Sequence, residues 1–317
     1  MAGEFSSIEI CAGGGGQALG LEHAGFRHEA LVEIEPAACD TLLFNRPGWN
    51  VVNADVASFD AGKYRGIDLL AGGVPCPPFS RAGKQLGSGD GRDLFPQALR
   101  LIKECRPRAV LLENVKGLLD ARFSAYRNEI IQYLYKLGYS GEWKLLNASS
   151  FGVPQLRPRA VLVAVKKELW TNFEWPGEND FTEPGTVGSS LRGLMAANGW
   201  KKADEWSEKA GSIAPTLVGG SKKHGGPDLG PTRAKKAWAA LSVDAHGLSD
   251  EPPVPGFSGM PRLTVKMTAK LQGFPDSWKF AGRKTVAYRQ VGNAFPPPVA
   301  KAVGQKIYKL LSEADNG

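Results

Sequence analysis

The chain has 317 residues, a net charge of +7 at neutral pH and a hydrophobic fraction of 42%, enough for a buried core in one large or two smaller domains. No apolar run reaches the roughly 18 residues that a membrane-spanning helix needs. An acid, Glu4, stands where a signal peptide would have basic residues. We therefore expect a soluble, cytoplasmic protein. The charge favours a polyanionic partner without establishing one, because many proteins that bind no nucleic acid are equally basic.

The first 165 residues alternate short apolar segments with helical patterns. Because the apolar segments are continuous rather than alternating, they predict a parallel sheet covered by helices on both faces, in an α/β fold. The predicted strands are residues 6–11, 28–34, 51–52, 67–71, 108–112 and 160–165, and the predicted helices are 17–24, 36–45, 94–105 and 124–137.

The pattern changes after about residue 170. Residues 171–259 are rich in Gly, Pro, Ser and Trp and show weak periodicity, which indicates a second, irregular domain with its tryptophans in the core. Regular patterning resumes at Pro261. A helix with one apolar face is predicted over residues 298–311, from the spacing of Val299, Val303, Ile307 and Leu310.

A predicted strand, four consecutive glycines and a helical pattern follow one another in IEICAGGGGQALGLEHAGF. Glycines allow a tight turn and a close approach of backbone amides to a ligand, which suits NAD, FAD, ATP or S-adenosylmethionine. Glu33 and Glu35 end the second strand, where an acid can bind ribose hydroxyls, and Asp55 ends the third, where it can accept from an adenine amino group. Together these positions predict a nucleoside pocket, although acids at solvated strand ends would give the same sequence pattern.

Four cysteines are present, at positions 11, 39, 76 and 105. None forms a CxxC pair or lies near a histidine at ligand spacing, so no zinc site is predicted. Cys76 lies in GGVPCPPFSRAGKQ, directly after a predicted strand, at the edge where open α/β sheets bind ligands. The flanking prolines stiffen its backbone, which suits a nucleophile that must be held in place. A buried thiol in a turn is the alternative, and the other three cysteines are expected to be packed, free thiols.

Polar residues also adjoin two further predicted strands. Glu113 and Asn114 follow the strand 108–112, where they are candidates for acid–base chemistry or for a helix N-cap. Arg157 and Arg159 precede the strand 160–165, where arginine can bind a planar acceptor or form a surface salt bridge.

In this order, the segments resemble the cytosine-C5 DNA methyltransferases of the bacterial restriction-modification type. The matching motifs are AGGGG, VEIEP, NADV, VPCPPFS, GRDLFPQALRLI, ENVKGL, VPQLRPRA, PRLTVKMTAKLQGFP and AYRQVGNAFPPPVA. The resemblance implies a Rossmann-like S-adenosylmethionine-dependent methyltransferase domain built from residues 1–170 plus 261–317. Residues 171–260 fall where the family has its smaller target-recognition domain. Two positions depart from the family pattern, since Cys11 replaces a Phe and Pro77 replaces a Gln that many members have.

The resemblance assigns catalytic roles. Cys76 would add to C6 of a flipped cytosine, so that C5 can accept the methyl group. Glu113 would bind N3 and the exocyclic amine with a raised pKa, and Arg159 would contact O2. The catalytic candidates are Cys76, Glu113, Arg159, Arg157 and Asn114, the last expected to orient its loop.

The cofactor implied is S-adenosyl-L-methionine, with S-adenosyl-L-homocysteine as the product and no metal. Its methionine part would lie by the glycine loop, its ribose by Glu33, and its adenine between Ile34 and Asp55. The cofactor-binding candidates are Cys11, Ala12, Gly13, Gly15, Gly16, Glu33, Ile34, Asp55, Val56, Gly73, Pro75, Asn293 and Ala294.

The partner implied is double-stranded DNA. Residues 166–260 hold 11 Lys/Arg and 12 Asp/Glu, a net of −1, so the rest of the chain carries +8. One stretch there, GGSKKHGGPDLGPTRAKKAW, is basic and suited to groove contacts, although a solvated basic surface would look the same. The DNA-binding candidates are Ser80, Arg81, Lys84, Gln155, Lys222, Lys223, His224 and Arg233.

The function implied is that of a monomeric DNA (cytosine-5-)-methyltransferase that protects host DNA from a cognate restriction endonuclease. A tRNA cytosine-5 methyltransferase on the same scaffold is one alternative, against which the long segment available for target reading counts. A catalytically silent DNA-binding homologue is a second, and the presence of Cys76, Glu113 and Arg159 counts against it.

Overall fold

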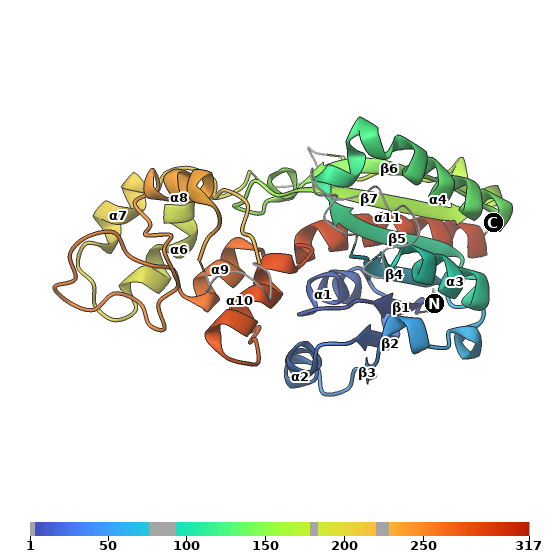
Figure 1. Ribbon diagram of the computed structural model, residues 1–317, viewed down its shortest axis with the longest axis horizontal. Coiled ribbons are helices and arrows are strands. Elements are labelled where there is room, and N and C mark those ends of the chain that lie inside the picture. Colours follow the sequence, from blue (N-terminus) through green and yellow to red (C-terminus); the bar gives the residue numbers. More distant parts are fainter. Residues whose placement is uncertain (1–3, 76–92, 178–182, 220–227, 317) are drawn as a thin grey trace.

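The computed structural model describes residues 4–75, 93–177, 183–219 and 228–316. Its strands form one sheet in the order β3-β2-β1-β4-β5-β7-β6 (Figure 1). They are β1 Ser6–Ile10, β2 Arg27–Glu33, β3 Val51–Asn53, β4 Leu69–Gly73, β5 Ala109–Val115, β6 Tyr139–Asn147 and β7 Pro158–Lys166. The α/β fold expected from the sequence is confirmed.

The sheet is mixed, so the prediction of a parallel sheet is wrong at one edge. β1 to β5 run parallel to one another, whereas β7 lies antiparallel to both β5 and β6. β6 is absent from the predicted strands because it is an edge strand with many half-buried and exposed positions and no continuous apolar run. The antiparallel β5–β7 register sets Val115 opposite Arg159.

Helices cover both faces of the sheet. Leu101 of α3 and Leu134 of α4 are buried on one face, and Leu21 of α1 and Ile307 of α11 are buried on the other. None of the described helices is both long and apolar enough to cross a membrane. The helices are α1 Gly16–His23, α2 Pro36–Asn45, α3 Phe95–Cys105, α4 Ser124–Lys136, α5 Lys167–Trp170, α6 Val187–Ala196, α7 Ala203–Lys209, α8 Thr232–Ala239, α9 Val265–Leu271, α10 Lys284–Asn293 and α11 Pro297–Asn316.

The last helix packs on the first. A Cβ atom at Gly20 of α1 would lie 2.5 Å from the Cβ of Ala300 in α11, so a side chain at this glycine would force the two helices apart. Both ends of the chain therefore build one layer of the molecule. The predicted apolar face of α11 is buried as expected, at Val299, Val303, Ile307 and Leu310.

A second packed region contains α6 to α10, on the left of Figure 1. Its core includes Trp200, Trp206 and Trp238, as expected, together with Met267 of α9 and Tyr288 of α10. Trp175 lies instead against the core beneath the sheet, where its indole N–H donates to Glu142 of β6. Residues after 261 thus contribute to both packed regions.

Candidate active site

A cavity of about 500 Å³ opens where β1, β2, β4 and β5 end. It lies at the point where the strand order reverses, because β2 and β4 flank β1 and their connections run in opposite directions along the sheet. Its volume falls in the range of roughly 300–1,000 Å³ typical of small-molecule sites. Many of the predicted site residues line it: Cys11, Ala12, Gly13, Gly16, Glu33, Ile34, Asp55, Val56, Gly73, Pro75, Glu113, Asn114, Arg159, Asn293 and Ala294.

The glycine turn is fastened to the acid at the end of β2. The backbone N–H of Gly13 donates to Oε2 of Glu33 at 2.7 Å, and the N–H of Glu35 donates to Oε1 at 2.8 Å. Gly13 has φ +54 and Gly15 has φ +85, left-handed conformations that favour glycine. Each Glu33 oxygen retains a lone pair for a further donor, so the carboxylate is both a structural anchor and a free acceptor.

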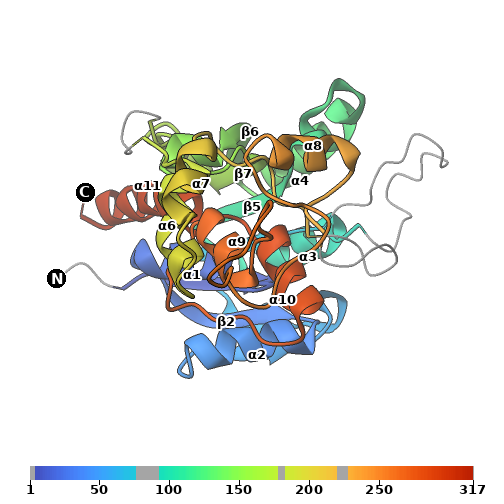
Figure 2. The ribbon, with the colours of Figure 1, turned by 90° about the vertical axis from the view of Figure 1, so that its left-hand side faces the viewer.

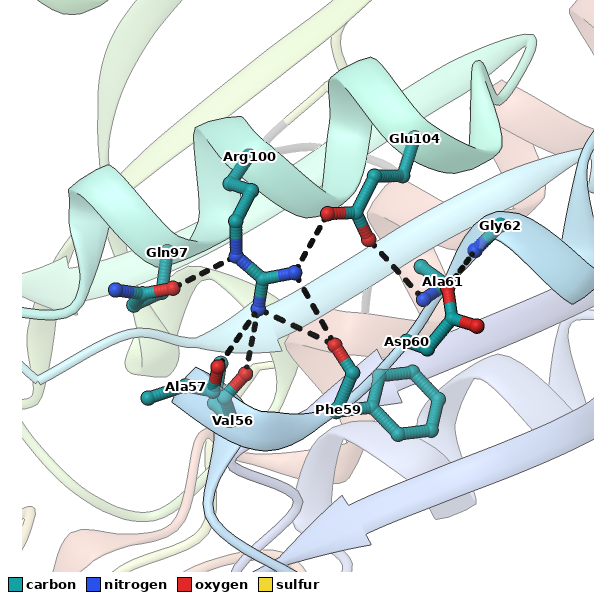
Figure 3. Close-up of polar contacts among 9 residues, drawn as sticks. All are labelled: Val56, Ala57, Phe59, Asp60, Ala61, Gly62, Gln97, Arg100 and Glu104. Carbon is teal, nitrogen blue, oxygen red and sulfur yellow. Dashed lines mark hydrogen bonds and ion pairs between the residues drawn. The ribbon is translucent and has the colours of Figure 1, made fainter.

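The segment after β3 is tied to α3 by one arginine (Figure 3). Asp55 caps the short 3₁₀ helix Val56–Ser58 by accepting from Ala57 N–H at 2.8 Å. Arg100 of α3 donates to the carbonyls of Val56 at 2.9 Å and Phe59 at 3.2 Å. The Arg100 guanidinium is itself held by Glu104 Oε1 at 2.6 Å. Its fork therefore fixes the turn that presents Asp55 and Val56 to the cavity.

Helix α10 supplies a wall of the cavity that the sequence motifs only partly indicated. Gln290 accepts from Thr41 of α2 at 2.7 Å, which holds α10 beside α2 (Figure 2). The lining residues of α10 recur at i, i+3, i+4 and i+7, a helical spacing that could have identified them from the sequence. They are Val286, Arg289, Gln290 and Asn293.

Other lining residues were also absent from the predicted set. The most unusual is Glu9 of β1, which is 1% exposed and whose Oε2 has no hydrogen-bond partner among the described residues. Burial raises the pKa of this carboxyl well above its usual range. An acid inside an apolar strand carries no distinctive sequence signal. The other members of this missed group are Gly14, Gln17, Val32, Ala37, Ala38, Val74, Leu94, Val115 and Phe295, and Glu35, the second acid of the predicted strand end, also lines the cavity.

Glu113 and Arg159 form a buried ion pair at the end of the cavity formed by β5 and β7. The distance from Arg159 Nε to Glu113 Oε1 is 2.6 Å, and the two residues are 8% and 7% exposed. Burial raises the pKa of Glu113, and the positive charges of Arg159 and Arg157 oppose this rise. Glu113 therefore keeps a proton to a higher pH than an exposed glutamate would.

The side chain of Asn114 orients the chain that leads to Cys76. Its Nδ2 donates to the carbonyl of Val74 at 2.7 Å, and its Oδ1 accepts from the N–H of Val115 at 2.8 Å. The N–H of Leu94 donates to the carbonyl of Pro75 at 3.3 Å. The segment that carries Cys76 therefore begins and ends at two residues, Pro75 and Leu94, that are hydrogen-bonded to each other. Asn114 holds the chain at the first of these ends against β5.

The other three cysteines are free thiols with raised pKa values, as expected for packed side chains. Burial raises the pKa of Cys39 to about 11 and that of Cys105 to about 12. Cys11 lines the cavity, and burial together with nearby Glu33 raises its pKa to about 12. Since a thiolate is the reactive form, none of these three thiols is activated as a nucleophile.

Four predicted residues lie away from the cavity. Gly15 caps α1, and a Cβ there would lie 2.7 Å from Leu42 and 2.8 Å from Trp278. Gln155 and Arg157 are fully buried and bind backbone groups near α9 and α10. Arg233 lies exposed on α8. The remaining predicted residues lie outside the described part of the chain: Cys76, Ser80, Arg81, Lys84, Lys222, Lys223 and His224.

The α/β sheet, with a buried acid–arginine pair beside a nucleoside-sized cavity, is typical of a nucleoside-binding enzyme. Comparison with known proteins then gives the family. The sequence model of the C-5 cytosine-specific DNA methylase family matches residues 5–309. The chain belongs to this family and is a methyltransferase, as its motifs predicted.

Relatives extend the match over nearly the whole chain. The type II methyltransferase M.NgoMIV of Neisseria gonorrhoeae is 56% identical, over 98% of this chain and 99% of its own length. The type II methyltransferase M.NaeI of Lentzea aerocolonigenes is 55% identical, over 98% of this chain and 76% of its own length. A crystal structure of a Spodoptera frugiperda DNMT2 mutant shares the fold, with a TM-score of 0.67 and 20% identity over 96% of this chain and 99% of that one.

Proposed function

We propose that this protein transfers the methyl group of S-adenosyl-L-methionine to C5 of a cytosine flipped out of duplex DNA, within a short recognition site. The observation that carries the proposal is that one cavity joins the acids Glu33 and Asp55 to the buried Glu113–Arg159 pair. The first two acids suit a nucleoside, and the pair suits a flipped pyrimidine. Type II methyltransferases at 55–56% identity support DNA as the substrate.

The residues that line the cavity fit S-adenosylmethionine. Glu33 offers free lone pairs to ribose hydroxyls, and Asp55 offers an acceptor to the adenine amino group. Ile34 is 57% exposed beside the cavity, an apolar surface that an adenine ring would cover. The turn at Gly13 and Gly16, with Asn293 and Ala294 opposite, would hold the methionine part. When bound, the cofactor supplies an electrophilic methyl group on a sulfonium.

The side chains divide the chemistry on the base. The Cys76 thiolate would add to C6, and the electron pair of the C5=C6 bond would move to C5, which takes the methyl group. Glu113 would hydrogen-bond N3 with its retained proton and accept from the exocyclic amine, while Arg159 would stabilise O2. Loss of the C5 proton to a base and departure of the Cys76 thiolate would restore the ring. Asn114 would hold residues 74–75 in place, so that Cys76 faces the base.

The duplex would contact both regions of the molecule. The base must leave the stack, because C5 and C6 are inaccessible in a duplex. Ser80, Arg81 and Lys84 follow Cys76 and would bind the flanking phosphates. Residues 171–260 would read the site, through Lys222, Lys223 and His224 and through the exposed Arg233. The basic excess of the rest of the chain would bind the backbone.

The cellular role follows from the class of relatives. The enzyme is proposed to act as a monomer in the cytoplasm and to protect host DNA from a cognate restriction endonuclease, and the type II methyltransferases at this identity support the protective role. Methylation by the pure enzyme should protect a plasmid from that endonuclease.

The reaction is tested by trapping the covalent adduct. Fluorine at C5 cannot leave as a cation, so duplex DNA containing 5-fluorocytosine should form a stable complex with the enzyme in the presence of S-adenosylmethionine. The complex should be absent with Cys76→Ala. The absence of any adduct with wild-type enzyme on mixed-sequence DNA would contradict the mechanism. An adduct formed only with tRNA containing 5-fluorocytosine would favour the RNA alternative.

A further inference from the structure

One short segment of the recognition region is bound on one side by the chain leading into β7 and on the other by residues 292–294 at the wall of the cavity. This segment, residues 214–219, is called the junction segment below. On one side it pairs with the chain leading into β7, since Ala214 N–H donates to Pro154 O at 3.0 Å and Leu156 N–H donates to Ala214 O at 2.8 Å. Thr216 Oγ1 also donates to Leu156 O. The junction segment is therefore hydrogen-bonded to the chain just before β7, the strand that carries Arg159.

Gln155 extends this attachment with its side-chain amide. Its Oε1 accepts from Leu217 N–H at 2.9 Å, and its Nε2 donates to Gln272 Oε1 at 2.6 Å. Gln272 in turn donates to the carbonyl of Ala294 at 2.6 Å. Since Gln155 and Gln272 are completely buried, these bonds are shielded from competing water.

The side chain of Arg157 hydrogen-bonds both to the junction segment and to the wall of the cavity. Its Nη1 donates to Leu217 O at 2.7 Å, and its Nη2 donates to Gly292 O at 2.6 Å and Ala294 O at 3.0 Å. The side chain is 0% exposed. Gly292 and Ala294 flank Asn293, which lines the cavity together with Ala294. The guanidinium thus bridges a recognition segment and the cofactor wall, two residues from Arg159.

Close backbone packing reinforces the bridge. A Cβ at Gly292 would lie 2.4 Å from Cα of Gly219, and a Cβ at Gly219 would lie 2.3 Å from Oδ1 of Asn293. Only glycine at both positions lets the two backbones meet. A displacement of the junction segment therefore displaces Asn293, and a displacement of Asn293 moves the junction segment.

We propose that Arg157 is a positioning residue that couples DNA binding to cofactor binding through the junction segment. This inference rests on the function proposed above. The junction segment leads directly into residues 220–227, the basic stretch expected to contact DNA. Both ligands favour the arrangement in which the junction segment is seated on residues 292–294. Each ligand therefore raises the affinity for the other, and by linkage the two effects are equal.

The test measures the coupling itself. The recognition site is first mapped by bisulfite sequencing of a plasmid that expresses the enzyme. The Kd for a duplex with that site is then measured by fluorescence anisotropy, with and without saturating S-adenosylhomocysteine. We expect the wild-type Kd to fall at least 5-fold with S-adenosylhomocysteine, within the usual range of about 5- to 150-fold for coupled sites. Arg157→Lys, which cannot reach three carbonyls with a planar fork, should reduce this ratio to less than 2-fold.

Two further variants separate positioning from folding. Gly219→Ala keeps Arg157 but drives a methyl group against Asn293, so it should reduce the ratio as well, and it carries the test if Arg157→Lys does not fold. Arg192→Lys removes part of an exposed pair with Asp204 and should keep the wild-type ratio. If Arg157 had only a structural role, Arg157→Lys would lower the melting temperature of the enzyme and leave the ratio of the two Kd values unchanged.

The outcomes distinguish this inference from the proposed function. A wild-type ratio of one, or an unchanged ratio in the folded Arg157→Lys or Gly219→Ala variant, would overturn the coupling while the fluorocytosine adduct still forms. Failure of the wild-type enzyme to form that adduct would instead overturn the proposed function.

Discussion

The sheet region and the α6–α10 region place their functional residues in different ways. In the sheet region, strand ends carry the candidates, and hydrogen bonds fix them, as Arg100 fixes the turn at Asp55 and as β5 and β7 fix Glu113 and Arg159. In the α6–α10 region, tryptophans such as Trp238 form the core, and Arg233 lies exposed on a short helix. Rigid strand ends suit a reaction common to a family, whereas exposed positions can change without loss of the fold.

The largest effect on activity should come from the buried carboxyl of the sheet region. Glu113→Gln can still hydrogen-bond N3 but cannot carry a proton to it, so kcat should fall by about 10²- to 10⁴-fold. Duplex affinity should stay within a few-fold of wild type. Single-turnover kinetics and anisotropy measure the two quantities, with the exposed Glu205→Gln as the matched control. A variant with undiminished turnover would remove Glu113 from the mechanism.

The same carboxyl makes a pH prediction with a defined sign. Because burial raises the pKa of Glu113, its protonated form persists above the pH at which an exposed glutamate ionises. If that form is the active one, kcat of the wild type relative to that of Glu113→Gln falls as the pH rises through the raised pKa. A wild-type profile with no fall relative to that of Glu113→Gln over the same interval would show that the protonated form is not the active one.

The α6–α10 region should respond most strongly to loss of its core. Trp238 is completely buried, so Trp238→Ala should lower the free energy of unfolding by about 3–5 kcal/mol. Trp175→Ala, at a half-buried position beneath the sheet, should cost less. Urea denaturation measures both. Equal losses in the free energy of unfolding would contradict the expectation that Trp238 contributes more to packing than Trp175.

A smaller effect is expected from the arginine that holds the turn at Asp55. Arg100→Lys loses the planar fork that binds the carbonyls of Val56, Ala57 and Phe59, so the KM for S-adenosylmethionine should rise about 10-fold, equivalent to about 1.4 kcal/mol. The kcat at saturating cofactor and the KM for DNA should stay within 2-fold. Steady-state kinetics test this split, and an equal fall of kcat with an unchanged cofactor KM would count against it.

The smallest effect should come from the exposed surface of the recognition region. Arg233→Ala should weaken duplex binding a few-fold and reduce the slope of log Kd against log salt by about 1, if Arg233 contacts a phosphate. Titrations at several salt concentrations measure the slope, with Arg262→Ala, whose side chain is paired with Asp244, as the control. An unchanged slope would mean that Arg233 makes no phosphate contact.

The sequence determined the parts of this protein that depend on local order along the chain. Continuous apolar runs indicated the parallel strands, and the acids at or near their carboxyl ends, Glu33, Asp55 and Glu113, were identifiable because parallel strands end at a common edge of the sheet. The order of the motifs sufficed to indicate the family. The apolar spacing of residues 298–311 likewise indicated the terminal helix and its buried face.

Only the tertiary structure decided which residues from distant segments meet. Arg157 and Arg159 read alike in RPRA, yet Arg159 lies within β7 and meets Glu113, whereas Arg157 precedes the strand and lies among the carbonyls of Leu217, Gly292 and Ala294. The antiparallel insertion of β7 and the buried Glu9 also escaped local patterns. The physical reason is that strand pairing and burial depend on partners far apart in the chain, which periodicity within one segment does not specify.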